Sequence, residues 1–178
     1  MGWTYKLHAG AAAVPGIVLL VLTALTWLPG TLPLTESGWP MAVIVVLLFP
    51  IFISALVRVF VTRADRHSLW LAFRCLPRRV QTGLGALAVS GVVMMVFSTA
   101  AQGNLQSAEV KGGRYYAFDT TPHARGTVEV SRSRYQAVLE SDQRSMFAIP
   151  GLLLVGAAYA VLAAGELRRL DRRPGLDH

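Results

Sequence analysis

Four long stretches without a charged residue constrain this 178-residue chain more than any other feature of its sequence. They run between Lys6 and Glu36, Glu36 and Arg58, Arg79 and Glu109, and Arg144 and Glu166. Each stretch can hold a helix of about 20 apolar residues, the length that crosses a hydrocarbon layer about 30 Å thick. We therefore expect an all-α integral membrane protein with four transmembrane helices, at about 9–28, 40–61, 81–101 and 146–165.

The first apolar stretch is expected to be retained as a helix, because it is long and no A-x-A cleavage site follows it. Four such stretches separated by charged loops argue against buried helices of a water-soluble core. The sequence thus predicts a single membrane domain over residues 1–178.

The distribution of charge supports this reading. Charged residues make up 15% of the chain, below the roughly 25% of soluble domains. The net charge of +7 comes from basic residues at the ends of the apolar runs, where membrane proteins place them. We therefore expect a lipid bilayer as partner and no nucleic acid.

No metal or cofactor is expected. The single cysteine, Cys75, excludes an intramolecular disulfide and a cysteine-rich metal site within one chain. A buried haem would need axial ligands, and no histidine of another span faces Met94 or Met95. No Asp, Glu, Lys, Arg or His falls in the middle of a span, which disfavours ion-coupled carriers.

The loops predict an orientation. The loop after the first span has Glu36 and no Lys or Arg, whereas the loop at 62–80 and the tail after the last span are rich in arginine. The positive-inside rule then places both termini and the 62–80 loop in the cytoplasm. The segment at 102–145 contains six basic and five acidic residues, so it is nearly neutral. It is expected to lie outside a bacterial cytoplasmic membrane.

The 62–80 loop has the pattern of an amphipathic helix. Leu69, Trp70, Phe73 and Leu76 recur at helical spacing, and arginines surround them. Such a helix is expected to lie on the inner leaflet and bind anionic lipid headgroups. The predicted headgroup contacts are Arg63, Arg66, Arg74, Arg78 and Arg79.

The outer segment is predicted to form a ββα insert between the third and fourth spans. Residues 114–119 and 127–131 alternate around a loop that contains Pro122 and Gly126, as in an antiparallel hairpin. The alternation places Tyr116 and Phe118 on one face. A helix follows Ser131, its apolar stripe faces the hairpin, and it leads into the last span.

This polar insert is the candidate surface for binding a partner. The residues predicted to form the surface are Tyr115, Tyr116, Asp119, His123 and Glu129. An Asp–His pair with a nearby threonine hydroxyl is one way to build a base and nucleophile. Asp and Thr before proline are ordinary turn formers, however, so no catalytic or metal-binding residue is predicted here.

The outer segment also resembles a known group of proteins. The order G-x-Y-Y, turn, G-x-V-x-V, serine cap, tyrosine is carried by Gly113, Tyr115, Gly126, Val130 and Tyr135. It is similar to small multipass bacterial membrane proteins of uncharacterised function. The strong excess of arginine over lysine is of an actinobacterial type. The resemblance implies a strand, a turn and a helix leading into the last span, and no catalytic residues.

Three classes of function remain after these arguments. The first is a non-enzymatic accessory, binding or protective protein of the cell envelope, with toxin immunity as a special case. The second is a transporter or channel subunit, whose pore forms by oligomerisation. The third is a membrane-embedded lipid-modifying enzyme, which needs several polar residues together at one leaflet. Small residues at spacing four, such as Gly156, Ala160 and Ala164, fit packing within one bundle or against another copy or membrane protein.

Overall fold

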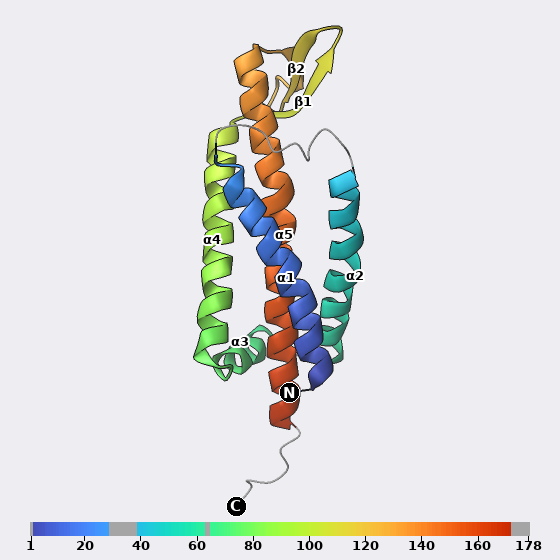
Figure 1. Cartoon of the computed structure of the whole chain (residues 1–178), viewed down its shortest axis with the longest axis vertical. Coiled ribbons are helices and arrows are strands. Elements are labelled where there is room, and N and C mark those ends of the chain that lie inside the picture. The colour runs from blue at the N-terminus through green and yellow to red at the C-terminus, as the bar shows by residue number, and fades with distance from the viewer. Residues whose placement is uncertain (1, 29–38, 63–64, 172–178) are drawn as a thin grey trace, which may run out of the picture.

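The computed structural model describes residues 2–28, 39–62 and 65–171, which form a helical bundle with a small sheet beyond one end (Figure 1). The elements are α1 (Trp3–Leu25), α2 (Trp39–Val61), α3 (Arg66–Arg74), α4 (Arg78–Gln102), β1 (Leu105–Lys111), β2 (Arg114–Asp119), β3 (Gly126–Glu129) and α5 (Arg132–Asp171). We call the two ends of the bundle the sheet end and the α3 end.

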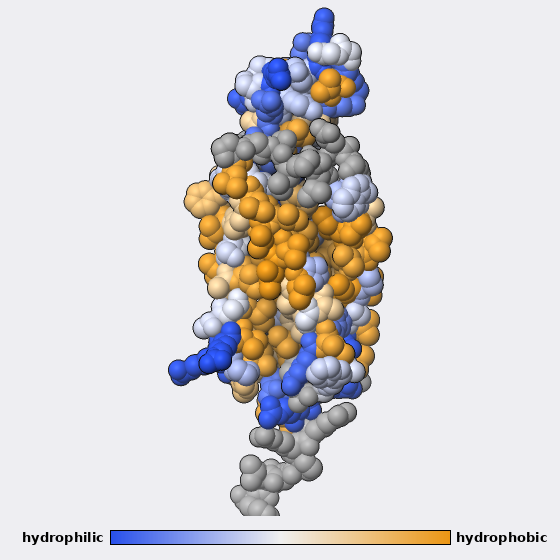
Figure 2. Space-filling model, viewed as in Figure 1, coloured by the Kyte–Doolittle hydropathy of each residue, from blue (hydrophilic) through white to orange (hydrophobic). Residues whose placement is uncertain are grey.

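Four helices of the described chain, α1, α2, α4 and α5, are long and apolar enough to cross a membrane. This agrees with the four predicted spans, although the bounds differ: α1 ends at Leu25 rather than at residue 28, and two helices begin earlier than expected. The first begins at Trp3 rather than at residue 9, and the third begins at Arg78 rather than at residue 81. On the face that Figure 2 shows, side chains are apolar over the middle of the bundle, and hydrophilic residues lie beyond this band at both ends.

The last helix, α5, organises the fold. The predicted outer helix and the predicted fourth span form one continuous helix of 40 residues, about 60 Å long at 1.5 Å per residue. The start of α5 carries the sheet through Val138, and from Ser141 onward the helix packs against α1, α2, α3 and α4. Pro150 lies inside it without ending it, as prolines do in helices supported by neighbours.

Helices α1 and α5 cross in close contact at two glycines. A Cβ atom at Gly16 would lie 3.2 Å from the Cβ of Leu154 and 3.3 Å from the carbonyl oxygen of Gly151. A Cβ at Gly151 would in turn lie 3.2 Å from the Cβ of Leu19. Small residues allow such approach, and in lipid this close packing is what holds helices together.

On either side of this crossing α1 contacts a different helix, α4 toward the sheet end and α2 toward the α3 end. Toward the sheet end it meets α4, where Gly91 packs on Leu20 and the rings of Trp27 and Phe97 lie 6.4 Å apart. Toward the α3 end it meets α2, where His8 Nε2 lies 3.1 Å from the carbonyl oxygen of Ile51. Helices α1 and α4 therefore separate toward the α3 end (Figure 1).

The sheet has three antiparallel strands in the order β1-β2-β3, and it packs one face on α5. Leu105, Ala117 and Val138 form the buried contact between sheet and helix. The rings of Tyr115 and Tyr135 lie 4.9 Å apart in the same layer. The opposite face carries Tyr116 and Phe118, as the alternation predicted, and Phe118 is 41% exposed.

The prediction of a two-stranded ββα insert was incomplete, because residues 105–111 form a further strand. Its tight connection to β2 uses Gly112 and Gly113, both at positive φ, a conformation that glycine adopts without strain. Strand β1 has a bulge between Gln106 and Glu109 and a mostly polar sequence, so it lacks the apolar alternation that marks a strand. A third strand also explains how so small a sheet is stable on one helix.

The α1–α5 crossing generates a prediction about stability. Gly16→Leu should lower the unfolding free energy in mild detergent by about 1–3 kcal/mol, because the new side chain must push the two helices apart. Gly156→Leu is the matched control on α5, since nothing lies within 4 Å of a Cβ there. Equal losses in the two variants, measured by thermal unfolding, would contradict a tight crossing at Gly16.

Candidate functional surfaces at the two ends of the bundle

At the sheet end, Asp119 and the two threonines after it, which the sequence analysis considered as possible site residues, stabilise the loop from β2 to β3. The Asp119 carboxylate accepts hydrogen bonds from the backbone N–H and the hydroxyl of Thr121. The Thr120 hydroxyl donates to the carbonyl oxygen of Asn104 at 2.9 Å, and the Asn104 amide donates to the Thr121 hydroxyl at 3.1 Å. These bonds connect the residue before β1 to the end of β2. Asp119 and the threonines therefore have the turn-forming role that their residue types predict.

The predicted surface residues do not form one cluster. Tyr115 faces α5, Asp119 is engaged in the loop, and His123 is an exposed loop residue with φ 72°. Tyr116 and Glu129 are brought together, because they are paired across β2 and β3. Both lie on the sheet face that points away from α5.

We call this side of the sheet the outer sheet face. Phe118 and Tyr116 form its apolar centre, and charged residues lie around them. Arg114 Nη1 lies 3.4 Å from Glu129 Oε2, and Lys111 Nζ lies 2.8 Å from Glu109 Oε2. An exposed aromatic residue ringed by charge is typical of a surface that contacts protein.

Arg144 fixes this end of α5 to α1. Its guanidinium donates to the carbonyl oxygen of Thr26 at 3.2 and 3.3 Å, pairs with Glu140 at 3.2 Å, and lies 4.7 Å from the ring centre of Trp27. A cation at the carboxyl end of a helix satisfies carbonyls that have no partner within the helix. The helix that carries the sheet is therefore joined to α1 by side-chain contacts at this end of the bundle.

At the α3 end, the predicted amphipathic helix exists and packs on the bundle. The Asp65 side chain caps it by accepting from the N–H of Ser68 at 3.0 Å, and hydrogen bonding by the Ser68 side chain, and then by its N–H, lowers the pKa of Asp65. Phe73 contacts Tyr159 of α5, with ring centres 4.9 Å apart. Gln81 donates to the carbonyl oxygens of Arg74 and Leu76 at 2.9 and 2.7 Å, which fixes the corner between α3 and α4.

Of the predicted lipid-contacting arginines, Arg74, Arg78 and Arg79 are exposed around this corner. Arg66 is the first residue of α3. Arg63, and the side chain of Arg66, lie outside the described residues. The corner is thus a basic surface next to the apolar band of the bundle.

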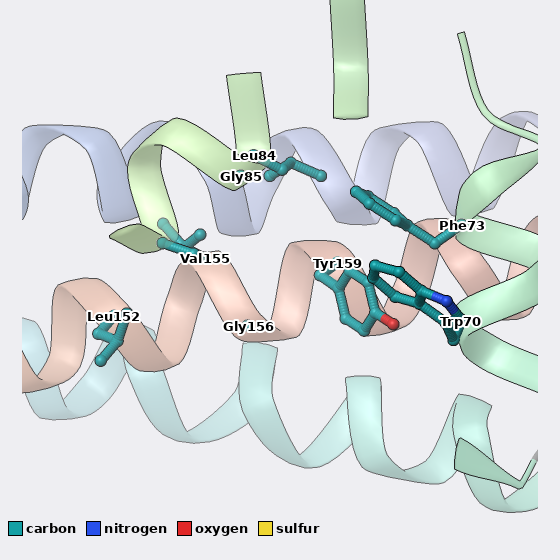
Figure 3. Close-up of a pocket in the computed structure, with 9 residues that line it drawn as sticks. Trp70, Phe73, Leu84, Gly85, Leu152, Val155, Gly156 and Tyr159 are labelled. Carbon is teal, nitrogen blue, oxygen red and sulfur yellow. The ribbon is translucent and has the colours of Figure 1, made fainter. Parts of the chain in front are cut away.

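An apolar cavity of about 370 Å³ lies between α3, α4 and α5. Figure 3 shows Trp70, Phe73 and Tyr159 together on one side of it. Gly85 and Gly156 border it, and nothing lies within 4 Å of a Cβ built on either. Gly156, the first of the small residues spaced by four on α5, therefore borders a cavity and is not in close contact with another helix.

A polar cluster that sequence reasoning missed joins α1 to α2 and α5. Tyr5 accepts a hydrogen bond from Arg168 at 3.0 Å, and the guanidinium of Arg58 lies 4.5 Å from its ring centre. One turn further, His8 Nε2 lies 3.2 Å from the Ser54 hydroxyl. Tyr5 and His8 on α1, and Ser54 and Arg58 on α2, are spaced so that each pair lies on one helix face. This spacing was the signal in the sequence for a polar contact between the two helices.

The Ser54 hydroxyl donates to the carbonyl oxygen of Pro50 at 2.6 Å. Its proton is therefore directed into its own helix, and His8 has the Ile51 carbonyl as an alternative partner. This is the geometry of a helix contact, in contrast to a nucleophile whose proton points to its base. In the described residues, no group of three or more metal-ligating side chains occurs.

No protein-family model, curated protein or solved structure matches this chain. The fold and the surfaces at its two ends therefore rest on the geometry alone. Within residues 2–28, 39–62 and 65–171, that geometry comprises four helices able to cross a membrane and a small three-stranded sheet.

The Asp119 loop generates a prediction about pH. The Thr121 hydroxyl and backbone N–H lower the pKa of Asp119 below 3.8. Because the folded-state pKa is depressed, the carboxylate's contribution to the loop is complete above that value and is lost as pH falls through the lowered pKa. Thr121→Val should raise the Asp119 pKa back toward 3.8, as read from the carboxyl ¹³C shift in an NMR titration. Asp65, capped by Ser68, is the control and should titrate unchanged.

Proposed function

We propose that this chain is a multi-pass protein of a bacterial cytoplasmic membrane and a non-enzymatic accessory or protective protein of the cell envelope. In this proposal both termini and α3 face the cytoplasm, and the sheet lies outside. The outer sheet face binds another envelope protein, and the arginines at the α3–α4 corner contact anionic headgroups. An immunity-like role is one form that such binding takes.

The continuity of α5 is the observation that carries the proposal. One helix bears the sheet near its start and contacts the other helices of the bundle along the rest of its length. A partner on the outer sheet face is then joined rigidly to the membrane part, with Arg144 fixing the junction to α1. A sheet that only capped the bundle would need no such connection.

The distribution of polar groups also favours binding over transport. The buried polar side chains of the described residues lie toward the ends of the bundle: Thr23, Thr26, Ser98, Ser141, Gln143 and Glu166. Thr23 and Thr26 donate to carbonyl oxygens of their own helix at 2.8 and 2.6 Å. The region of the α1–α5 crossing between them is filled by glycine and leucine, which offers no ligands to an ion.

The proposed orientation predicts a labelling pattern. Cys75 is exposed at the α3 end, so a membrane-impermeant thiol reagent should modify it only after the cells are permeabilised. Ala124→Cys in a Cys75→Ser background should be modified in intact cells, because residue 124 is exposed in the β2–β3 loop. The reverse pattern would place the sheet in the cytoplasm and overturn the orientation.

The proposed partner predicts a site-specific crosslink. A photoreactive phenylalanine analogue at Phe118 should give a defined protein adduct in cells, because this side chain is exposed at the centre of the outer sheet face. The same analogue at Ala137, which is exposed on α5, is the control and should give none. No protein or lipid adduct at position 118, together with enzymatic activity of the purified chain, would refute the accessory role.

A further inference from the structure

The divergence of α1 and α4 leaves a groove at the α3 end of the bundle. It has a volume of about 330 Å³, and α5 forms its floor with Ala158 and Leu162. Ile17 of α1 and Leu87 of α4 line its deeper part. The groove is thus apolar along its length and follows the direction of the helices.

Two cations lie at the shallow end of this groove. Lys6 lines it from the second turn of α1, and Arg79 lines it from the first turn of α4. Both side chains are exposed. Among the residues that the structure describes, neither lies in an ion pair. An unneutralised pair of cations at the mouth of an apolar groove favours an occupant with an anionic head and an apolar tail.

The dimensions of the groove fit one leaflet of a bilayer. From Lys6 to Ile17 the helix rises about 16 Å, at 1.5 Å for each of eleven residues. Half of a hydrocarbon layer about 30 Å thick is about 15 Å. A headgroup at the two cations would therefore place an acyl chain alongside Ile17 and Leu87, ending near the middle of the bilayer.

We propose that this groove is a binding site for one anionic glycerophospholipid, whose phosphate lies between Lys6 and Arg79 and whose acyl chain fills the groove. The proposal rests on the membrane placement of the four helices but not on a partner for the sheet. A second copy of this chain is a poorer occupant, because two copies meeting at this groove would bring four cations together. A soluble anion would leave the apolar surface unused.

Two glycines that line the groove can be substituted by larger residues without disturbing the packing of the helices. Gly10 and Gly83 line it from opposite sides, and nothing lies within 4 Å of a Cβ built on either. A leucine at Gly83 would occupy the space of the acyl chain while leaving both cations in place. Gly85 is the matched control, since it has equal room for a side chain but faces the cavity on the α3 side of α4.

The experiment is native mass spectrometry of the full chain released from micelles, titrated with a phosphatidylglycerol and, separately, with a phosphatidylcholine of the same acyl chains. We expect a one-to-one adduct that favours phosphatidylglycerol. Lys6→Gln and Arg79→Gln should each weaken it about fivefold, and Lys6→Arg should restore it. Gly83→Leu should abolish the adduct, whereas Gly85→Leu should retain it. Glycerol 1-phosphate, which carries the head without the tail, should not compete.

Specific results would overturn the proposal. Equal binding of the two lipids would show that the cations do not select the headgroup. Retention of the adduct in Gly83→Leu, or its loss only in Gly85→Leu, would place the lipid elsewhere. Competition by glycerol 1-phosphate would indicate an anion site without a chain site. Thermal unfolding of each variant identifies losses caused by misfolding, and the thiol-labelling pattern tests membrane placement separately.

Discussion

The close crossing of α1 and α5 at Gly16 and Gly151 determines the arrangement of the other elements. In a bilayer, apolar side chains gain nothing by leaving lipid for protein, so helix association depends on close contact and on polar bonds. Here the contact is so close that a single Cβ would disturb it. With α1 fixed against α5 at its middle, its two ends can meet different neighbours. Polar bonds then join α1 to α5 at the sheet end and to α2 at the α3 end.

This geometry gives the two ends of the molecule different characters. At the sheet end, a guanidinium from α5 satisfies the carbonyl of Thr26 and stacks on Trp27. The bundle is closed there, and α5 continues outward as the support of the sheet. At the α3 end, α1 and α4 separate, cations line the opening, and the space between the helices is apolar. One end is built to hold a folded surface away from the bundle, and the other is open to small apolar chains.

The residues that first suggest chemistry have structural roles. Asp119 and the two threonines after it form the bonds that close a loop. His8 contacts the carbonyl oxygen of Ile51, and Ser54 donates to the carbonyl oxygen of Pro50, so both side chains bond to the backbone of α2. In both places the polar side chains bond to nearby backbone groups. Among the described residues, Phe118 on the outer sheet face and Lys6 and Arg79 at the α3 end are exposed and have no such role.

Four apolar helices, the amphipathic α3 and a separate polar segment between α4 and α5 could be predicted from the sequence, because charge-free length and helical or strand periodicity are local properties. The strand at 105–111 was not predicted, because a polar edge strand is specified by its pairing with a neighbouring strand, and this pairing is not a local property of the sequence. Tertiary structure alone decided that Tyr115 faces α5 while Tyr116 faces outward with Glu129, and that Tyr5 meets Arg58 and Arg168. It also decided that Lys6 and Arg79 share one groove. Two residues more than seventy positions apart come together only when helices cross at a particular angle, and no periodicity records that angle.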